Sequence, residues 1–196
     1  MEERLGTELP YAAAAIPPGV SEGCVKRIGY VLEGAGFEVT NIVDEPTAAA
    51  AVLKISDGAV VDVGGGTTGV SILKDGKVIY TNDEATGGTH MTMTVAGHYQ
   101  IPYDEAEILK KQPEKEREIF PVIKATVDKM AIITQKFIEG YDVPAVYVVG
   151  GSSTFRDFTS VFAKRLKLPI YQPVHPLLVT SLGIAYCCEL PKLNEK

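Results

Sequence analysis

The feature that most constrains this 196-residue sequence is an apolar stretch that ends in a carboxylate and three consecutive glycines. Residues 60–63 read Val-Val-Asp-Val, residues 64–68 read Gly-Gly-Gly-Thr-Thr, and a second apolar stretch follows. Glycine allows a backbone to turn tightly and to approach a bound group without a Cβ in the way. Because successive amides in such a turn can form an anion-binding concavity, the pattern predicts a phosphate-binding turn, with Asp62 placed to hold a divalent cation or its water.

The composition limits the remaining classes of function. A net charge of −6 disfavours broad contact with nucleic acid or an anionic membrane. No apolar run is long enough to span a bilayer, and residues 1–4 do not resemble a secretion signal. Cys24, Cys187 and Cys188 have neither metal-ligand spacing nor a paired framework, and the three histidines lack zinc-motif spacing. A cytoplasmic location is therefore expected.

The periodicity of apolar residues predicts alternating strands and helices, which is typical of the α/β class. A hairpin is expected over 59–84, because Asp75 and Gly76 suit the positive φ angles of a type I′ turn. Further strands are expected at 11–16, 37–43, 145–149 and 168–171. Helices are expected at 21–36, 46–53 and 104–111, in a longer segment that ends at Gly140, after residue 153 up to about 166, and at 176–190.

Four segments carry a resemblance to a known superfamily. Residues 45–50 and 181–185 begin or form helices of small residues, and residues 62–68 and 148–153 join a strand to a glycine turn. Their order and spacing resemble the actin, sugar-kinase and seventy-kilodalton heat-shock chaperone superfamily. The resemblance implies an actin-like (ribonuclease H-like) ATPase fold, with a mixed sheet flanked by helices. It also implies that the small-residue helices cross as a hinge between two lobes, and that ATP or ADP and Mg²⁺ are bound.

A closer resemblance is to the EutJ family of ethanolamine-utilisation proteins. It rests on residues 17–19, 44–48, 62–69 and 83–88, supported by 105–107 and 129–131, and it extends from about residue 7 to about residue 187. The resemblance implies an actin-like nucleotide-binding protein that is encoded with the enzymes of the ethanolamine bacterial microcompartment. Proteins of this family are often described as chaperones.

The resemblance also predicts how the chain is divided. Residues 1–55 would form part of the first lobe with one hinge helix, and residues 173–196 would return to it as the second hinge helix. Residues 56–88 and 141–172 would form the nucleotide-binding core of the second lobe, with 89–140 as a helical insertion. The expected structure is thus mostly the second lobe with part of the first.

One motif of the superfamily is missing from the sequence. The superfamily opens with an Asp-x-Gly-Thr hairpin that holds the phosphates from the first lobe, and no such motif precedes residue 20. We expect a fragment of a longer protein, the alternative being true absence of the segment. Loss of two charge-assisted hydrogen bonds removes about 3–6 kcal/mol, or about two to four decades in affinity. This chain alone would then bind ATP weakly and hydrolyse it negligibly.

The same reasoning predicts association between chains. The strand at 11–16 would lack its sheet neighbours, and the hinge helices would expose apolar faces. Unpaired strand edges and bare apolar patches favour association. A homo-oligomer formed by strand pairing or through the hinge is therefore expected, the alternative being a disordered first segment.

Two acidic residues are assigned catalytic roles by the resemblance. Asp62 resembles the carboxylate of the second lobe that holds hydrated Mg²⁺ or orients the attacking water. Its alternative role is to cap the glycine turn at the end of a strand. Glu45 resembles the hinge-helix acid that contacts the water shell of Mg²⁺. Its alternative role is to complement the dipole of the helix that it begins, which contributes about 0.3–1 kcal/mol.

The remaining site residues are expected to bind the nucleotide. The glycine turn would bind phosphates, residues 87–88 would pass close to the sugar, residues 107–111 would meet ribose and adenine, and residues 150–152 would form a floor under the adenosine. The alternatives are a tight bend, an ordinary Glu–Lys pair and a strand-to-helix turn. The assigned residues are Gly64, Gly65, Gly66, Thr67, Thr68, Gly87, Gly88, Glu107, Lys110, Lys111, Gly150, Gly151 and Ser152.

Two departures weaken the resemblance to the heat-shock chaperones. Gly69 stands where they carry a second aspartate, and Thr154 stands where they carry an arginine that stacks on adenine. The main hypothesis is a nucleotide-dependent assembly factor for ethanolamine-utilisation enzymes or shell proteins, associated with the microcompartment, with at most weak Mg-dependent ATPase activity. The alternatives are a small-molecule kinase, a filament-forming protein and a degenerate scaffold that binds no nucleotide.

Overall fold

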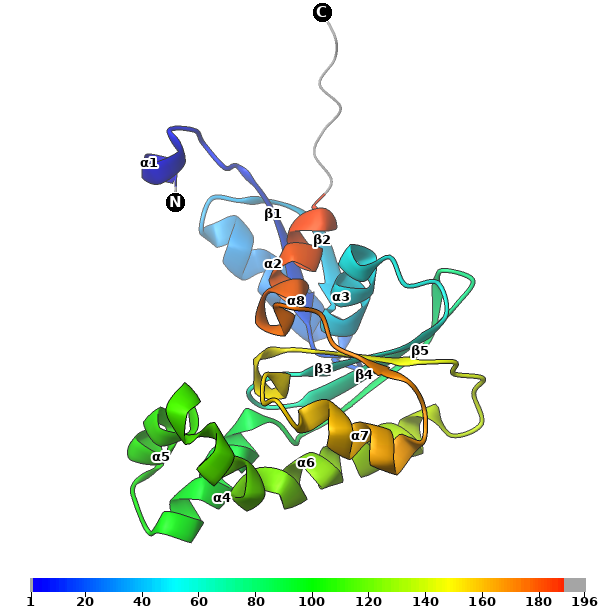
Figure 1. Ribbon diagram of the computed structural model, residues 1–196. Coiled ribbons are helices and arrows are strands. Elements are labelled where there is room, and N and C mark those ends of the chain that lie inside the picture. Colours follow the sequence, from blue (N-terminus) through cyan, green and yellow to red (C-terminus); the bar gives the residue numbers. More distant parts are fainter. Residues whose placement is uncertain (1, 189–196) are drawn as a thin grey trace, which may run out of the picture.

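The computed structural model describes residues 2–188 and contains two sheets flanked by helices (Figure 1). The larger sheet has five strands in the order β5-β4-β3-β6-β7. Its central strand β3 pairs antiparallel with β4 and parallel with β6, so the sheet is mixed, as the fold class predicts. Its strands are β3 (Gly58–Val63), β4 (Thr68–Lys74), β5 (Lys77–Glu84), β6 (Val146–Val149) and β7 (Ile170–Tyr171).

Helices cover both faces of this sheet, and its central strand β3 is therefore buried along its whole length. Ala59, Val61 and Val63 pack with α6 (Glu116–Ile138) and α7 (Phe158–Leu166) on one face. Val60 packs on the other face with α3 (Glu45–Leu53) and α8 (Pro176–Tyr186). Alternate residues of a strand point to opposite faces, so Asp62 shares the face of Val60 and lies on the side of α3 and α8.

Helices α3 and α8 cross in contact, as expected for the two small-residue helices. Gly183 of α8 lies so close to α3 that a Cβ on it would overlap the Ala48 carbonyl oxygen. Ala48, Ala49 and Gly183 are buried at the crossing. The small side chains therefore explain the close approach of the two backbones.

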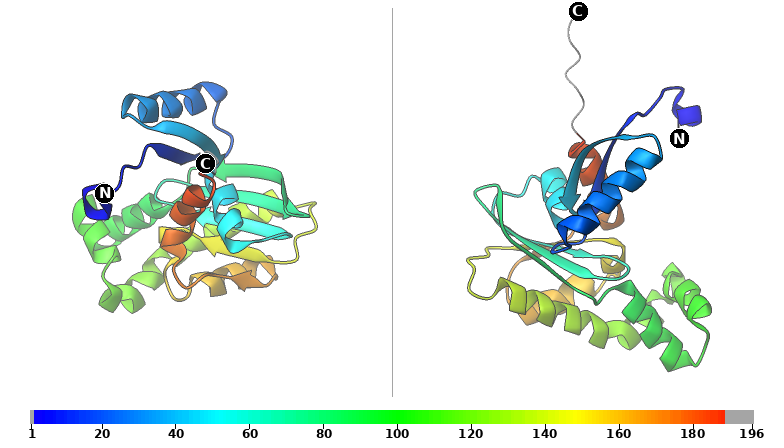
Figure 2. Two further views of the ribbon diagram at one scale, coloured as in Figure 1. Left: turned by 90° about the horizontal axis from the view of Figure 1, so that it is seen from above. Right: turned by 180° about the vertical axis from the view of Figure 1, so that it is seen from behind.

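A smaller unit of two strands and one helix lies beside this crossing (Figure 2). Strand β1 (Tyr11–Ile16) pairs in parallel with β2 (Glu38–Asp44), and α2 (Glu22–Gly34) connects them. The prediction that residues 11–16 lack sheet neighbours was therefore wrong for one edge. Within residues 2–188 these two strands form a sheet by themselves, so their outer edges stay unpaired there. Before β1 lies a single turn of helix, α1 (Glu2–Leu5).

The remaining helices form a separate group between β5 and β6, which the views show projecting from one end of the sheet. They are α4 (Gly88–Tyr99), α5 (Tyr103–Lys110) and the start of the long helix α6. Helix α5 begins at Tyr103, with Pro102 at the N-cap, one residue before the start predicted from the sequence. No helix of the described part of the chain combines the length and apolarity needed to cross a membrane.

The β4–β5 turn has positive φ at Asp75 (50°) and Gly76 (71°), as predicted. The boundaries of two helices differ slightly from the sequence predictions. After β6 the chain forms a 3-10 turn, η2 (Gly151–Ser153), and α7 begins only at Phe158. Helix α8 ends at Tyr186, and the last two residues of the predicted helix, 189 and 190, lie outside the described residues.

Candidate nucleotide site

A cavity of about 770 Å³ opens between the glycine turn after β3, the starts of α3, α4 and α8, helix α5 and the turn η2. Most residues that the sequence assigns to the site line this cavity, although they come from distant segments. These residues are Glu45, Asp62, Gly64, Gly65, Gly88, Glu107, Lys110, Lys111, Gly150, Gly151 and Ser152. The volume lies within the range of about 300–1,000 Å³ that is usual for small-molecule sites.

The glycine turn leaves backbone donors unused. Two of its carbonyl oxygens are hydrogen-bonded, because Gly64 accepts from the amide of Gly88 at 3.0 Å and Gly65 accepts from the amide of Thr89 at 2.8 Å. The amides of Gly65, Gly66 and Thr67, in contrast, donate no hydrogen bond within residues 2–188. Adjacent amides that lack an acceptor in the protein are suited to binding an anion.

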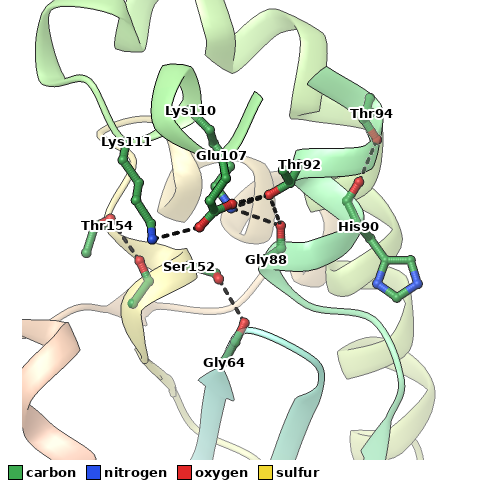
Figure 3. A network of polar contacts seen from close by, with 11 residues as sticks. Gly64, Gly88, His90, Thr92, Thr94, Glu107, Lys110, Lys111, Ser152 and Thr154 are labelled. Carbon is green, nitrogen blue, oxygen red and sulfur yellow. Dashed lines mark hydrogen bonds and ion pairs between the residues drawn. The ribbon is translucent and has the colours of Figure 1, made fainter. Parts of the chain in front are cut away.

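The second glycine corner follows β6 and has the same character. Gly150 has a φ of 90°, and its amide donates to the Pro176 carbonyl at 3.0 Å. The next two amides, of Gly151 and Ser152, have no acceptor among the described residues. The Ser152 hydroxyl donates to the Gly64 carbonyl at 2.8 Å (Figure 3). This bond joins the two corners directly, so both face one cavity.

Asp62 is held at the end of β3 between the two corners and is only 6% exposed. Burial raises the pKa of its carboxyl group, and a hydrogen bond from the Thr180 hydroxyl opposes that shift. A Cβ on Gly150 would overlap Asp62 Oδ1, so only glycine leaves room for the carboxylate at this corner.

Glu45 is the first residue of α3, whose N-cap is Asp44 with its carboxylate accepting from the Thr47 amide at 2.9 Å. Burial raises the pKa of Glu45, and the negative charges of Asp62, Asp83 and Asp44 raise it further. A cation in the cavity would relieve this repulsion. No group of three His, Cys, Asp or Glu side chains that could hold a metal ion by themselves occurs in residues 2–188. The charge repulsion between Glu45 and Asp62 fits a hydrated Mg²⁺ bound beside them.

The opposite wall carries an ion-pair network between α4 and α5 (Figure 3). Glu107 pairs with Lys110 at 2.7 Å and Lys111 at 2.8 Å, and it accepts a hydrogen bond from Thr92. Burial acts to raise its pKa, but hydrogen bonds from Lys110, Lys111 and Thr92 together lower the pKa of Glu107 to about 2. Glu107 is therefore ionised at neutral pH and can only accept hydrogen bonds.

The two lysines of this network have different surroundings. The Lys110 side chain is 9% exposed and also donates to the Gly88 carbonyl at 3.0 Å and to Thr92 Oγ1 at 2.7 Å. The Lys111 side chain is 69% exposed and contacts only Glu107 among the ion pairs of the described residues. Lys110 thus fixes the start of α4 against α5, whereas the more exposed Lys111 contributes to the cavity wall through its ion pair with Glu107.

Four of the predicted site residues do not line the cavity, namely Gly66, Thr67, Thr68 and Gly87. Thr68 is buried and donates its hydroxyl to the Thr86 carbonyl at 2.6 Å, so that hydroxyl is occupied within the protein. A Cβ on Gly87 would lie 2.7 Å from the backbone of residues 65–67. Gly87 therefore packs against the backbone of the glycine turn and does not line the cavity.

Several cavity residues were not found by sequence reasoning. Thr180 lies on α8 and contacts Asp62, yet in the sequence it is only the residue before the small-residue pattern of 181–185. The side chains of Met91, Tyr103, Phe155 and Leu177 add apolar walls. Single apolar residues near helix starts or in the bend before α7 belong to no motif, so nothing in the sequence distinguishes them from core or surface positions.

Comparison with known proteins gives the family. The family described as cell division protein FtsA matches residues 59–183. The ethanolamine utilization protein EutJ of Salmonella typhimurium is 43% identical over 94% of this chain, and the chain spans 65% of the length of that curated relative.

Solved structures agree with the sequence matches. The crystal structure of EutJ from Carboxydothermus hydrogenoformans has a TM-score of 0.86 at 48% identity, over 94% of this chain and 68% of the other. The AMPPNP-bound MreB5 of Spiroplasma citri has a TM-score of 0.77 at 20% identity, over 88% of this chain and 66% of the other, which shows a shared fold. The mixed sheet with its crossing helices is thus the actin-like ATPase fold, and the chain belongs to the EutJ family of ethanolamine-utilisation proteins.

Proposed function

We propose that this chain binds ATP or ADP together with Mg²⁺ in the cavity between its two glycine corners. The observation that carries the proposal is that Gly65 and Gly151, whose amides donate no hydrogen bond within residues 2–188, line the same cavity as the buried Asp62. Anion donors and a cation-holding acid are the two chemical requirements of a Mg-nucleotide site. Support by fold comes from MreB5 of Spiroplasma citri, which was solved with AMPPNP and with ADP.

Each wall of the cavity has a separate task in this proposal. The amides of the two corners hold the phosphates, and Glu107 accepts from the ribose hydroxyls while Lys111 lies against the base. Bound Mg²⁺ would supply positive charge to the phosphate oxygens, with Asp62 and Glu45 holding its water shell. Either acid could orient an attacking water, but Gly69, which pairs with Asp62 across β3 and β4, contributes no further carboxylate. The site therefore favours binding over rapid hydrolysis.

We further propose that nucleotide binding serves an assembly role in ethanolamine utilisation, with an enzyme or a shell protein of the microcompartment as partner. The EutJ relatives are ethanolamine utilization proteins by name. Helix α8, which reaches the cavity, also exposes Leu178, Leu182 and Tyr186 at four-residue spacing, so they share one helix face. A contiguous exposed apolar face is typical of a protein-binding surface, and α8 would connect this surface to the nucleotide.

The binding proposal is tested by titrating labelled ATP with Mg²⁺ into the protein. We expect saturable binding that Asp62→Asn weakens about tenfold or more, because a hydrogen bond to a charged group contributes about 1.5–3 kcal/mol. Asp75→Asn removes the same charge at the exposed β4–β5 turn, outside the cavity, and should leave the dissociation constant unchanged. Absence of saturable binding to the unmodified protein would contradict the proposed function.

A further inference from the structure

Thr180 has a place in the site that the proposed function does not use. It lies on α8, lines the cavity and donates its hydroxyl to Asp62 Oδ2 at 2.5 Å. This is the one hydrogen bond that the Asp62 carboxylate accepts within residues 2–188. A carboxylate that is 6% exposed and has a single protein donor depends on that donor for its orientation.

The other oxygen of Asp62, Oδ1, lies against Gly150, and both residues line the cavity. Asp62 Oδ1 lies beside Gly150, in the space that a Cβ would occupy, and it accepts no hydrogen bond from the part of the chain described. The Thr180 bond to Oδ2 therefore selects which oxygen is presented at the glycine corner. Rotation of the carboxylate would break this bond and move Oδ1 away from Gly150.

The helix that carries Thr180 is fixed at two further points. Its first residue, Pro176, accepts the Gly150 amide at 3.0 Å, and Gly183 packs directly on the Ala48 backbone of α3. The position of the Thr180 hydroxyl is thus set by both the second glycine corner and the helix crossing. A side chain placed this firmly can orient its partner with little further loss of conformational entropy.

We propose that Thr180 is a positioning residue of the nucleotide site, holding the Asp62 carboxylate so that Oδ1 faces the cation that accompanies the phosphates. The inference rests on the proposed function, because it concerns the Mg-dependent part of nucleotide binding. The unspent amides of Gly65 and Gly151 do not involve Thr180. Removing its hydroxyl should therefore affect Mg-dependent affinity and spare the affinity for ATP without Mg²⁺.

The test is a titration of labelled ATP in Mg²⁺ and, separately, in EDTA, for the unmodified protein and two matched variants. Thr180→Val keeps the branched shape without the hydroxyl. The factor by which Mg²⁺ increases its affinity for ATP should be about tenfold smaller than in the unmodified protein, and its affinity for ATP in EDTA should be unchanged. Thr180→Ser keeps the hydroxyl and should retain that gain. Thr180→Ala gives a second hydroxyl-free variant, and thermal melting of the free proteins monitors folding.

A double variant separates positioning from general destabilisation. In an Asp62→Ala background Thr180→Val should cause no additional loss of Mg-dependent affinity, because the two side chains act as one unit. Equal Mg-dependent gains in Thr180→Val and the unmodified protein would overturn the inference and leave the proposed function intact. Loss in Thr180→Ser as large as in Thr180→Val, or equal losses in Mg²⁺ and EDTA, would also overturn it. Failure of the unmodified protein to bind ATP would overturn both proposals.

Discussion

Replacing Gly183 by valine is expected to lower the free energy of unfolding by about 3 kcal/mol or more, at the upper end of the range for overpacking. A Cβ at this position would overlap the carbonyl oxygen of Ala48. That atom belongs to the α3 backbone and cannot rotate aside as a flexible side chain could. Helices α3 and α8 would have to separate, which would expose Val60 and Val179 of the core beneath them. Urea unfolding followed by circular dichroism measures the change.

The matched control for Gly183 is Gly97, which also lies inside a helix. Gly97 is exposed on α4, and a Cβ on it would meet no other atom within 4 Å. Gly97→Val should therefore change stability by less than about 1 kcal/mol, since valine and glycine both have poor helix propensities. Equal unfolding free energies for Gly183→Val and Gly97→Val would show that the close helix crossing does not exist.

Replacing Gly150 by alanine is expected to abolish detectable binding of Mg-ATP. The new Cβ would overlap Asp62 Oδ1 and lie 2.5 Å from the Val63 carbonyl oxygen. The residue also has a φ of 90°, which side chains other than glycine rarely adopt. Both effects would displace the Asp62 carboxylate and the corner whose amides are proposed to bind phosphate. Titration of labelled ATP measures the loss, and thermal melting measures the accompanying destabilisation.

Gly140→Ala is the matched control, because it introduces the same backbone strain without the crowding. It has a similar φ of 85°, but a Cβ on it would meet no atom within 4 Å, and it does not line the cavity. Gly140→Ala should cost about 1 kcal/mol of stability and leave the dissociation constant for ATP unchanged. Retention of ATP binding by Gly150→Ala, or equal loss in both variants, would contradict the role of Gly150.

The parts of the fold that the sequence predicted best are those where backbone geometry demands one residue type. The close approach at Gly183 and the positive φ angles at Asp75 and Gly76 each require small or permissive residues, so their pattern is specific. The same holds for the two glycine corners, which lie on one cavity although Gly64 and Ser152 are 88 positions apart in the sequence. The order of these motifs was sufficient to predict the actin-like fold.

The parts that the sequence did not predict depend on contacts between distant segments. Thr180 resembles any polar helical residue until α8 is placed against β3. Thr68 was expected to bind phosphate, because a hydroxyl beside a glycine turn is a usual ligand, but tertiary structure pairs it with Thr86. The pairing of β1 with β2 was also missed, since a parallel partner that arrives after a helix leaves no local signal.

The central claim is that both glycine corners hold one nucleotide, and amide NMR tests it most directly. ATP with Mg²⁺ is titrated into ¹⁵N-labelled protein while the amide signals of Gly65, Gly66, Gly151 and Ser152 are followed. We predict that the signals of Gly65, Gly151 and Ser152 shift together and give one dissociation constant, because these residues line one cavity and their amides donate no hydrogen bond within residues 2–188. Shifts at only one corner, different constants for the two corners, or no shifts at either would contradict the claim.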